Sequence, residues 1–415
     1  MTPPDPYASA RDLGLMIGTP PERSARVTRG NWFYPPYNRW ALSHMAEVAP
    51  SAEVSRGAGP VRELPYRLAD AAEVEAVTCR DHAGVERTVG ELLTRTWSDA
   101  LLVLQGGAIV YERYDNDLGP DQLHLLASVT KSFTGTLALI AIDEGVLDPG
   151  RAAVDYVPEL AQGVFADTTV QQVLDMLVAA EWDELDWLGH EAGPEVEDSL
   201  FLRFLRRSGT WVDRMHEPDE GLLDFAATLA KSGEHGDTFM YLTPATDVLG
   251  WLLARAYGTP YVDLLAERIW SRIGAEHPAR ILLDPIGTPV ASGGLNATAR
   301  DLARFGQLLL DGGRRDDEQV LPPSVVATLR SGGDPDAFAR CPDVAHMPGW
   351  SYRAQWWVTP DGQPTAWGVC GQILWIDHEA DLVLARLASA PDSVDSARDV
   401  DEAALCEAVL AHFRA

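Results

Sequence analysis

Lysine is almost absent from this chain of 415 residues. Only Lys131 and Lys231 occur, and the other basic residues are arginines. Because 62 acidic residues oppose 33 basic ones, the formal net charge is −29. A surface this acidic repels nucleic-acid phosphates and anionic lipids, so we expect neither nucleic-acid nor membrane partners. The position of each lysine is informative, because so few occur.

Cysteine and long apolar runs are also scarce. The four cysteines are far apart and form no C-x-x-C pattern, which excludes a disulfide framework and a zinc site of that type. The longest apolar run, residues 137–142, is too short to span a bilayer. Residues 1–12 contain prolines and acids where a secretory signal has a basic start and an apolar core, so we expect a cytoplasmic protein.

The order of sequence patterns predicts an α+β fold. Two β-rich runs flank Gly106-Gly107, which is typical of a hairpin within residues 99–114. Helical patterns dominate from about residue 150 to 350. Strand patterns then return, followed by a helix. The late strands are expected at 355–359, 365–371, 373–377 and 382–389, and the last helix at 399–413.

These patterns suggest one antiparallel sheet built from both ends of the chain, with flanking helices. Residues 66–150 and 350–415 form this sheet domain, and residues 151–349 form an inserted helical lobe. Residues 1–65 are expected to be an irregular arm packed on the body. An active site would lie in the cleft between sheet and lobe.

The strongest chemical signal is Ser128-x-x-Lys131 at the start of a helix predicted over 128–144. Residues i and i+3 share one helix face, so the lysine can take the serine proton and activate the hydroxyl as a nucleophile. His124, four residues earlier, is more typical of a structural histidine.

Two further elements could complete a catalytic site. Tyr241 precedes a helix expected to be capped by Thr243 with Pro244 at its first position, and a tyrosine there can act as general base and then acid. The late segment Cys370-Gly371-Gln372-Ile373 has a glycine within a strand, which often marks close approach of a ligand. The N–H of Ile373 could join that of Ser128 in an oxyanion hole.

In this order, the three elements resemble the motifs of the penicillin-recognising serine hydrolases, which include class C β-lactamases, DD-peptidases and family VIII carboxylesterases. One branch, the 6-aminohexanoate-dimer (nylon-oligomer) hydrolases, is more similar. Segments of the chain that carry this resemblance include 38–41, 155–160, 246–249, 298–304, 355–357 and 371–375. The resemblance covers about residues 30–415 and implies a β-lactamase/transpeptidase-like fold.

The resemblance also implies roles for particular residues. Ser128 would be the acylated nucleophile, Lys131 its proton acceptor, and Tyr241 the acid that protonates the leaving amine. Ser128 and Ile373 would supply the oxyanion N–H groups. The expected substrate-binding residues are Trp187, Trp211, Ser292, Gly293, Cys370, Gly371 and Gln372.

Two departures concern the substrate pocket. Cys370 stands where nylon hydrolases have a histidine and β-lactamases a lysine. Trp187 lies near the place of a tyrosine whose hydroxyl meets the substrate amide, and residues 183–224 align poorly. The sequence therefore predicts a conserved catalytic core with a changed substrate pocket.

We expect a serine hydrolase that cleaves amide or ester bonds of small linear substrates, needs neither cofactor nor metal, and is able to form a homodimer. One alternative is a family VIII-type carboxylesterase with weak amidase or β-lactamase activity. An alternative of another class is a catalytically silent binding module on the same fold. No G-x-S-x-G or H-E-x-x-H pattern occurs, which disfavours an α/β-hydrolase triad and a zincin site.

Overall fold

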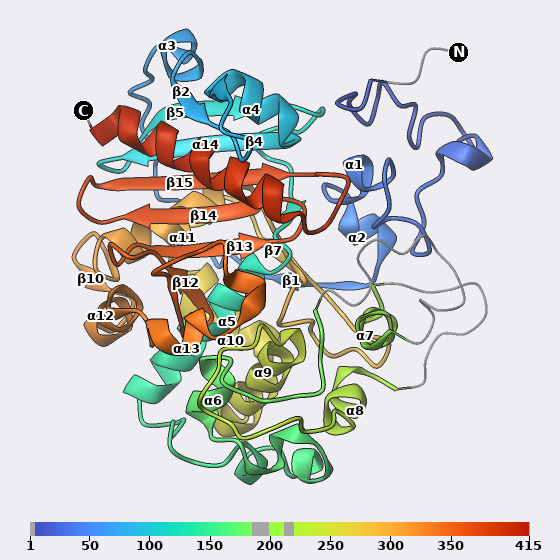
Figure 1. Cartoon of the computed structure of the whole chain (residues 1–415), viewed down its shortest axis with the longest axis vertical. Helices are drawn as coiled ribbons and strands as arrows, with labels where there is room; N and C mark the ends of the chain where they lie inside the picture. The colour runs from blue at the N-terminus through green and yellow to red at the C-terminus, as the bar shows by residue number, and fades with distance from the viewer. Residues whose placement is uncertain (1–4, 185–198, 211–219, 415) are drawn as a thin grey trace.

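A seven-stranded antiparallel sheet forms the centre of the molecule in the computed structural model, which describes residues 5–184, 199–210 and 220–414. The early hairpin lies beside the last strand of the chain, so both ends of the sequence build one sheet (Figure 1). In spatial order the strands are β11 (Ser351–Arg353), β12 (Trp356–Val358), β13 (Pro364–Gly368), β14 (Gln372–Asp377), β15 (Leu382–Ala388), β4 (Ser98–Gln105) and β5 (Ala108–Tyr114).

Both faces of this sheet are covered, which explains why its central strands β14 and β15 are buried along their whole length. On one face, Leu101 and Leu384 pack against Leu405 and Val409 of α14 (Ser396–Arg414) and against α4 (Val89–Arg95). On the other face, the alternate residues pack toward α5 (Val129–Asp143) and α11 (Ala299–Leu310). Within the sheet, β13 is one of the strands that contact α5.

A second sheet connects the arm, the lobe and the start of α5. Its order is β1 (Ser51–Val54), β7 (Ala279–Leu282), β8 (Leu295–Ala297) and β6 (His124–Leu125). Because β6 ends three residues before Ser128, this sheet fixes where the chain enters α5. Two small hairpins pair β2 (Thr78–Arg80) with β3 (Glu86–Thr88) and β9 (Arg314–Arg315) with β10 (Glu318–Gln319).

The helical lobe packs around α5 and α9. Its helices are α6 (Val170–Leu174), α7 (Leu200–Arg207), α8 (Leu222–Ala227), α9 (Thr243–Tyr257) and α10 (Tyr261–Leu265). The remaining helices are α1 (Asn38–Ala41), α2 (Met45–Val48), α3 (Ala71–Glu75), α12 (Pro323–Ser331) and α13 (Pro335–Ala339). Within the described residues, no helix is long and apolar enough to cross a membrane.

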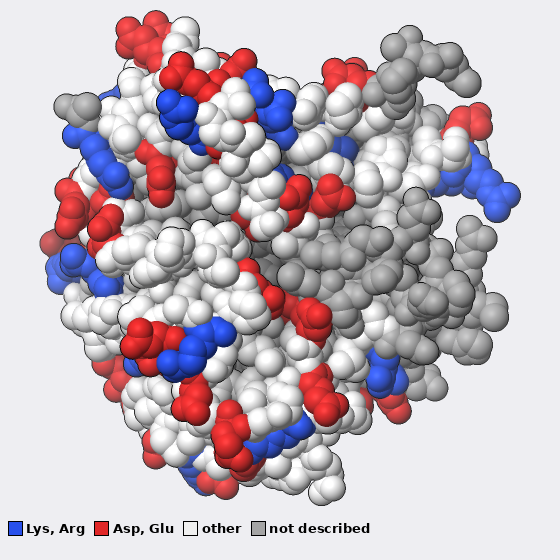
Figure 2. Space-filling model, in the orientation of Figure 1, with Lys and Arg blue, Asp and Glu red and all other residues white. Residues whose placement is uncertain are grey.

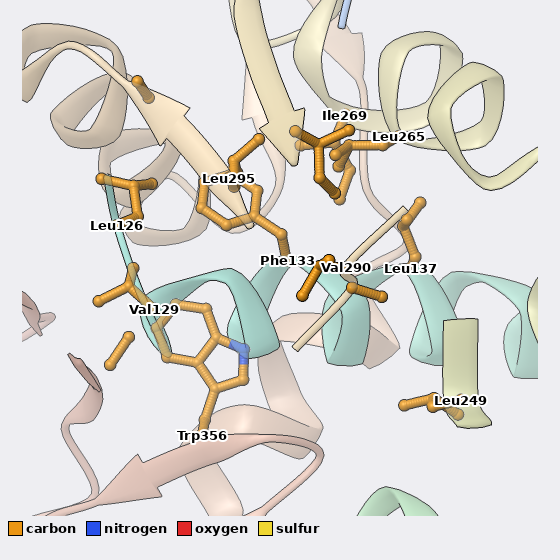
Figure 3. Close-up of a cluster of buried hydrophobic side chains, with 14 of the residues drawn as sticks. Leu126, Val129, Phe133, Leu137, Leu249, Leu265, Ile269, Val290, Leu295 and Trp356 are labelled. Atoms are coloured by element: carbon orange, nitrogen blue, oxygen red, sulfur yellow. The ribbon is translucent and has the colours of Figure 1, made fainter. Parts of the chain in front are cut away.

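Helix α5 runs through the interior, and thirteen of its residues, from Val129 to Ala141, are buried. Figure 3 shows Phe133 of this helix among Leu295, Ile269 and Val290, with Trp356 on the opposite side. The core packed around Val129 and Phe133 therefore fixes the position of the first turns of α5.

The α+β class and the antiparallel sheet built from both chain ends are confirmed. Two features differ from the sequence expectation. Helix α11 lies inside the segment expected to be a separate lobe, yet it packs on the central sheet. Thr243 is the first residue of α9 rather than its cap, because its hydroxyl is engaged by a buried carboxylate.

Candidate active site

The serine and lysine of the motif meet at the start of α5. Ser128 immediately precedes the helix, and Lys131 lies one turn further on the same face. The Lys131 Nζ donates to Ser128 Oγ over 2.7 Å and to the Ser292 carbonyl over 2.9 Å. Lys131 is 1% exposed, and this burial lowers its pKa to about 8. At pH 7 a minor fraction of the amine, about a tenth, is therefore neutral and can accept a proton.

Tyr241, just before α9, completes this group. The Lys131 Nζ lies 5.1 Å from the centre of the tyrosine ring, and the Tyr241 hydroxyl hydrogen-bonds with the Ser128 side chain. Burial, together with the negative charge of Glu184, raises the pKa of Tyr241 far above its ordinary value. Tyr241 is therefore a neutral phenol that can donate a proton. The raised pKa favours the role of acid over that of base.

Two buried carboxylates near Lys131 were missed by the sequence analysis. Glu184 accepts hydrogen bonds from Trp182 Nε1 over 2.7 Å and from the hydroxyl of Thr243. Asp247 accepts the Ser292 N–H over 3.0 Å through Oδ1, while its buried Oδ2 has no hydrogen-bond partner among the described residues. Burial raises the pKa of both groups, that of Asp247 to about 7.

The charges of both carboxylates oppose the effect of burial on Lys131 and raise its pKa. Asp247 lies in the segment 246–249, which carries the family resemblance, so the sequence could have indicated it as a candidate site residue. Glu184 lies in the poorly aligned segment 183–224, where the sequence offers no such indication.

The backbone facing Ser128 comes from Gly368 at the end of β13. A Cβ atom at Gly368 would lie 2.7 Å from the Leu126 carbonyl and 3.0 Å from the Ser128 nitrogen. Only glycine allows this approach. Val369 follows directly and lines the same cavity as Ser128.

Ile373 does not fit the expected oxyanion role. It is fully buried on the next strand, β14, where it pairs with Trp367 of β13 and packs in the core beside α14 and α4. It does not line the cavity that holds Ser128. The predicted segment lies in the right part of the sheet. However, Val369, which follows β13, lines the cavity with Ser128, whereas Ile373 on β14 does not.

Of the other residues in the predicted segment, 370–372, only Gly371 lines the cavity. Cys370 is 1% exposed, has a φ of +62° and does not line the cavity, and burial raises the pKa of its thiol to about 12. Gln372 donates from Nε2 to the Val369 carbonyl over 3.2 Å and to the Ala388 carbonyl over 2.7 Å. It therefore braces the turn that presents Val369.

Ser292 contributes backbone groups rather than a pocket wall, because its carbonyl binds Lys131 and its N–H binds Asp247. Gly293 follows, and a Cβ atom there would lie 3.9 Å from the Ala127 backbone. Neither residue lines the cavity. Trp187 and Trp211 lie outside the described residues.

A cavity of about 380 Å³ opens from this group. Ser128, Tyr241 and Glu184 line its catalytic end. Its wall also contains three tryptophans, Trp350, Trp357 and Trp367, and residues of α14. This size suits a small molecule rather than a protein substrate.

Away from the catalytic group, the described part of the chain contains one group of side chains that could hold a metal ion. It consists of Asp121, Glu276 and His277. Glu276 already pairs with Arg304 over 3.0 Å, and none of the three lines the catalytic cavity.

Comparison with known proteins identifies the family. The beta-lactamase family model matches residues 85–408. The 6-aminohexanoate-dimer hydrolase of Paenarthrobacter ureafaciens is 34% identical over 385 residues, covering 92% of this chain and 91% of that protein.

Solved structures agree. A Bacillus anthracis protein assigned as a 6-aminohexanoate-dimer hydrolase superposes with a TM-score of 0.82 at 29% identity, covering 94% of this chain and 98% of that one. A family VIII carboxylesterase shares the fold alone, with a TM-score of 0.53 at 15% identity over 77% of this chain and 96% of that one. This chain therefore belongs to the beta-lactamase family of serine hydrolases and, within it, to the 6-aminohexanoate-dimer hydrolase branch.

Proposed function

We propose that this hydrolase cleaves amide or ester bonds of small linear substrates, of the 6-aminohexanoate-dimer type, through an acyl-enzyme on Ser128. The observation that carries the proposal is the 2.7 Å contact between Lys131 Nζ and Ser128 Oγ at the end of a substrate-sized cavity.

In the first step, neutral Lys131 takes the Ser128 proton as Oγ attacks the substrate carbonyl and forms a C–O bond. The carbonyl oxygen becomes an oxyanion. Gly368 brings the turn at Val369 close to the Ser128 nitrogen, so we assign the two oxyanion donors to the N–H groups of Ser128 and Val369.

In the second step, the bond to the leaving group breaks and Tyr241 donates its proton to the departing amine or alcohol. The Lys131 ammonium then returns its proton to Tyr241, which restores both groups. A water molecule then attacks the acyl-enzyme by the same route and releases the acid. Glu184 and Asp247 tune the charge of Lys131 without touching the reacting atoms.

The proposal is tested with Ser128→Ala. The variant should fold normally and lose measurable turnover of p-nitrophenyl butyrate and of the 6-aminohexanoate dimer, because no acyl-enzyme forms. A fluorophosphonate probe should add its mass to the wild type at Ser128 and leave the variant unlabelled. Full activity in the purified variant would contradict the mechanism, and an unlabelled, inactive wild type would favour a silent binding module.

A family VIII-type carboxylesterase is the second candidate, favoured by the shared fold. Matched ester and amide substrates with the same acyl group separate the two. Turnover of esters with no detectable amide cleavage would select the carboxylesterase.

A further inference from the structure

The cavity has an unusually one-sided charge. Its wall carries five carboxylates, and among the described residues no lysine or arginine lines it. The five are Glu184, Asp343, Asp399, Glu402 and Glu407. On the face shown in Figure 2, acidic side chains border the hollow in the middle of the molecule.

Only some of this charge is neutralised inside the protein. Glu184 accepts three hydrogen bonds at the catalytic end, and Glu402 pairs with Arg386 over 3.1 Å and with Arg398 over 3.4 Å. Asp343, Asp399 and Glu407 make no ion pair with any residue that the structure describes. Burial and the charge of Glu402 raise the pKa of Asp399 to about 7, against the charge of Arg398, which lowers it. Arg414 acts in the same way on Glu407, whose pKa burial raises.

The same wall offers other groups that suit a cation. Trp350 and Trp367 lie edge to face with ring centres 6.3 Å apart, and both line the cavity. Aromatic faces beside carboxylates are the usual environment of an ammonium group. Ser393 also lines the wall, is 5% exposed, and has a hydroxyl without a hydrogen-bond partner within the described residues.

His346 does not offset this charge. It lines the cavity beside Asp343, and burial lowers its pKa, so its ring is neutral at physiological pH. A substrate carboxylate reaching this end would meet like charges and no described cation.

We propose that the α14 end of the cavity binds an ammonium group of the substrate, so that the natural substrate is a cationic linear amide or ester. This inference rests on the proposed hydrolase function and names its substrate class. Asp399 and Glu407 supply the charge, and Trp350 and Trp367 supply the aromatic faces.

Two substrate series locate the charge within the substrate. The first varies the acyl group in p-nitrophenyl esters of 6-aminohexanoate, hexanoate and adipate. The second varies the alcohol in butyrylcholine, its uncharged isostere 3,3-dimethylbutyl butyrate, and an anionic butyrate ester of 3-hydroxypropionate. In at least one of the two series, kcat/KM for the cationic member should exceed that for the neutral member by about tenfold to a hundredfold, as expected for a charge-assisted contact. The series that shows this preference tells whether the ammonium group belongs to the acyl part or to the alcohol part of the substrate. The anionic member should be the poorest.

A double variant tests the residues. Asp399→Asn with Glu407→Gln keeps the shape of the wall and should reduce the cationic preference, the ratio of kcat/KM for the cationic and neutral members, to below about threefold. Glu73→Gln with Glu86→Gln is the matched control, because both residues are exposed and lie outside the cavity, and it changes the net charge equally. The control should keep the preference.

The inference is overturned if neither series prefers the cation, or if the preference survives in the Asp399/Glu407 variant. Ser128-dependent turnover of neutral esters without a preference would leave the hydrolase function standing and remove only this inference. Calorimetric titration of Ser128→Ala with butyrylcholine and its neutral isostere gives a readout that does not depend on turnover. Tighter binding of the cation supports the proposal, and equal binding refutes it.

Discussion

At the scale of single residues, Lys131 has to lose its proton before it can act as a base. Its pKa of about 8 lies above physiological pH, so kcat/KM should rise with pH and level off above about 8. The negative charge of Glu184 raises this pKa. Glu184→Gln should therefore move the rise to lower pH, because it removes a charge that favours the ammonium form. An unchanged pH profile of kcat/KM would mean that Glu184 carries no charge in the free enzyme.

Tyr241 is predicted to matter according to the leaving group. An amine needs a proton to depart, whereas p-nitrophenolate leaves without one. Tyr241→Phe should reduce kcat on amides by about a hundredfold or more, the range of general acid catalysis, and reduce it much less on p-nitrophenyl esters. The measurement is kcat for an amide and an ester with one acyl group. Equal losses on both substrates would remove Tyr241 from the acid role.

At the scale of structural elements, the approach of β13 to the start of α5 sets the oxyanion geometry. Gly368→Ala places a methyl group 2.7 Å from the Leu126 carbonyl, so strand and helix have to separate. A displacement of this kind should lower kcat about a hundredfold. Gly119→Ala is the control, because a Cβ atom there meets nothing within 4 Å. Activity in Gly368→Ala equal to that of the control would show that Val369 is not an oxyanion donor.

At the scale of the whole molecule, a buried charge cluster joins the arm to the sheet and to the entrance of α5. Asp99 accepts from Arg39 over 2.9 Å and faces His124 Nε2 at 3.3 Å, and all three are nearly inaccessible. His124 therefore has the structural role expected from its sequence position. Asp99→Asn leaves a buried guanidinium without its counter-charge, which should lower the free energy of unfolding by about 3–5 kcal/mol.

The comparison for this prediction is Asp155→Asn, which breaks the half-exposed Arg151–Asp155 pair. Exposed pairs contribute little, so this variant should unfold with the wild type in urea. Equal midpoints for Asp99→Asn and Asp155→Asn would mean that the buried cluster does not tie these segments together.

The sequence by itself determined the features that depend on neighbours along the chain. Positions 128 and 131 share a helix face in any α-helix that contains them, so the serine–lysine pair followed from spacing alone. The glycine pair at 106–107 and the β-rich late segments likewise located most of the central sheet, because turn and strand preferences act over a few residues.

Only the tertiary structure decided which distant groups surround that pair. Whether Val369 or Ile373 faces Ser128 depends on how β13 and β14 pack against α5, and one strand of difference is invisible in a motif. Glu184 and the acids of α14 reach the cavity from separate segments of the chain, and Asp247 reaches Lys131 from a third. Their burial also sets the protonation of Lys131 and Asp247, because the cost of desolvating a charge depends on the complete packing around it.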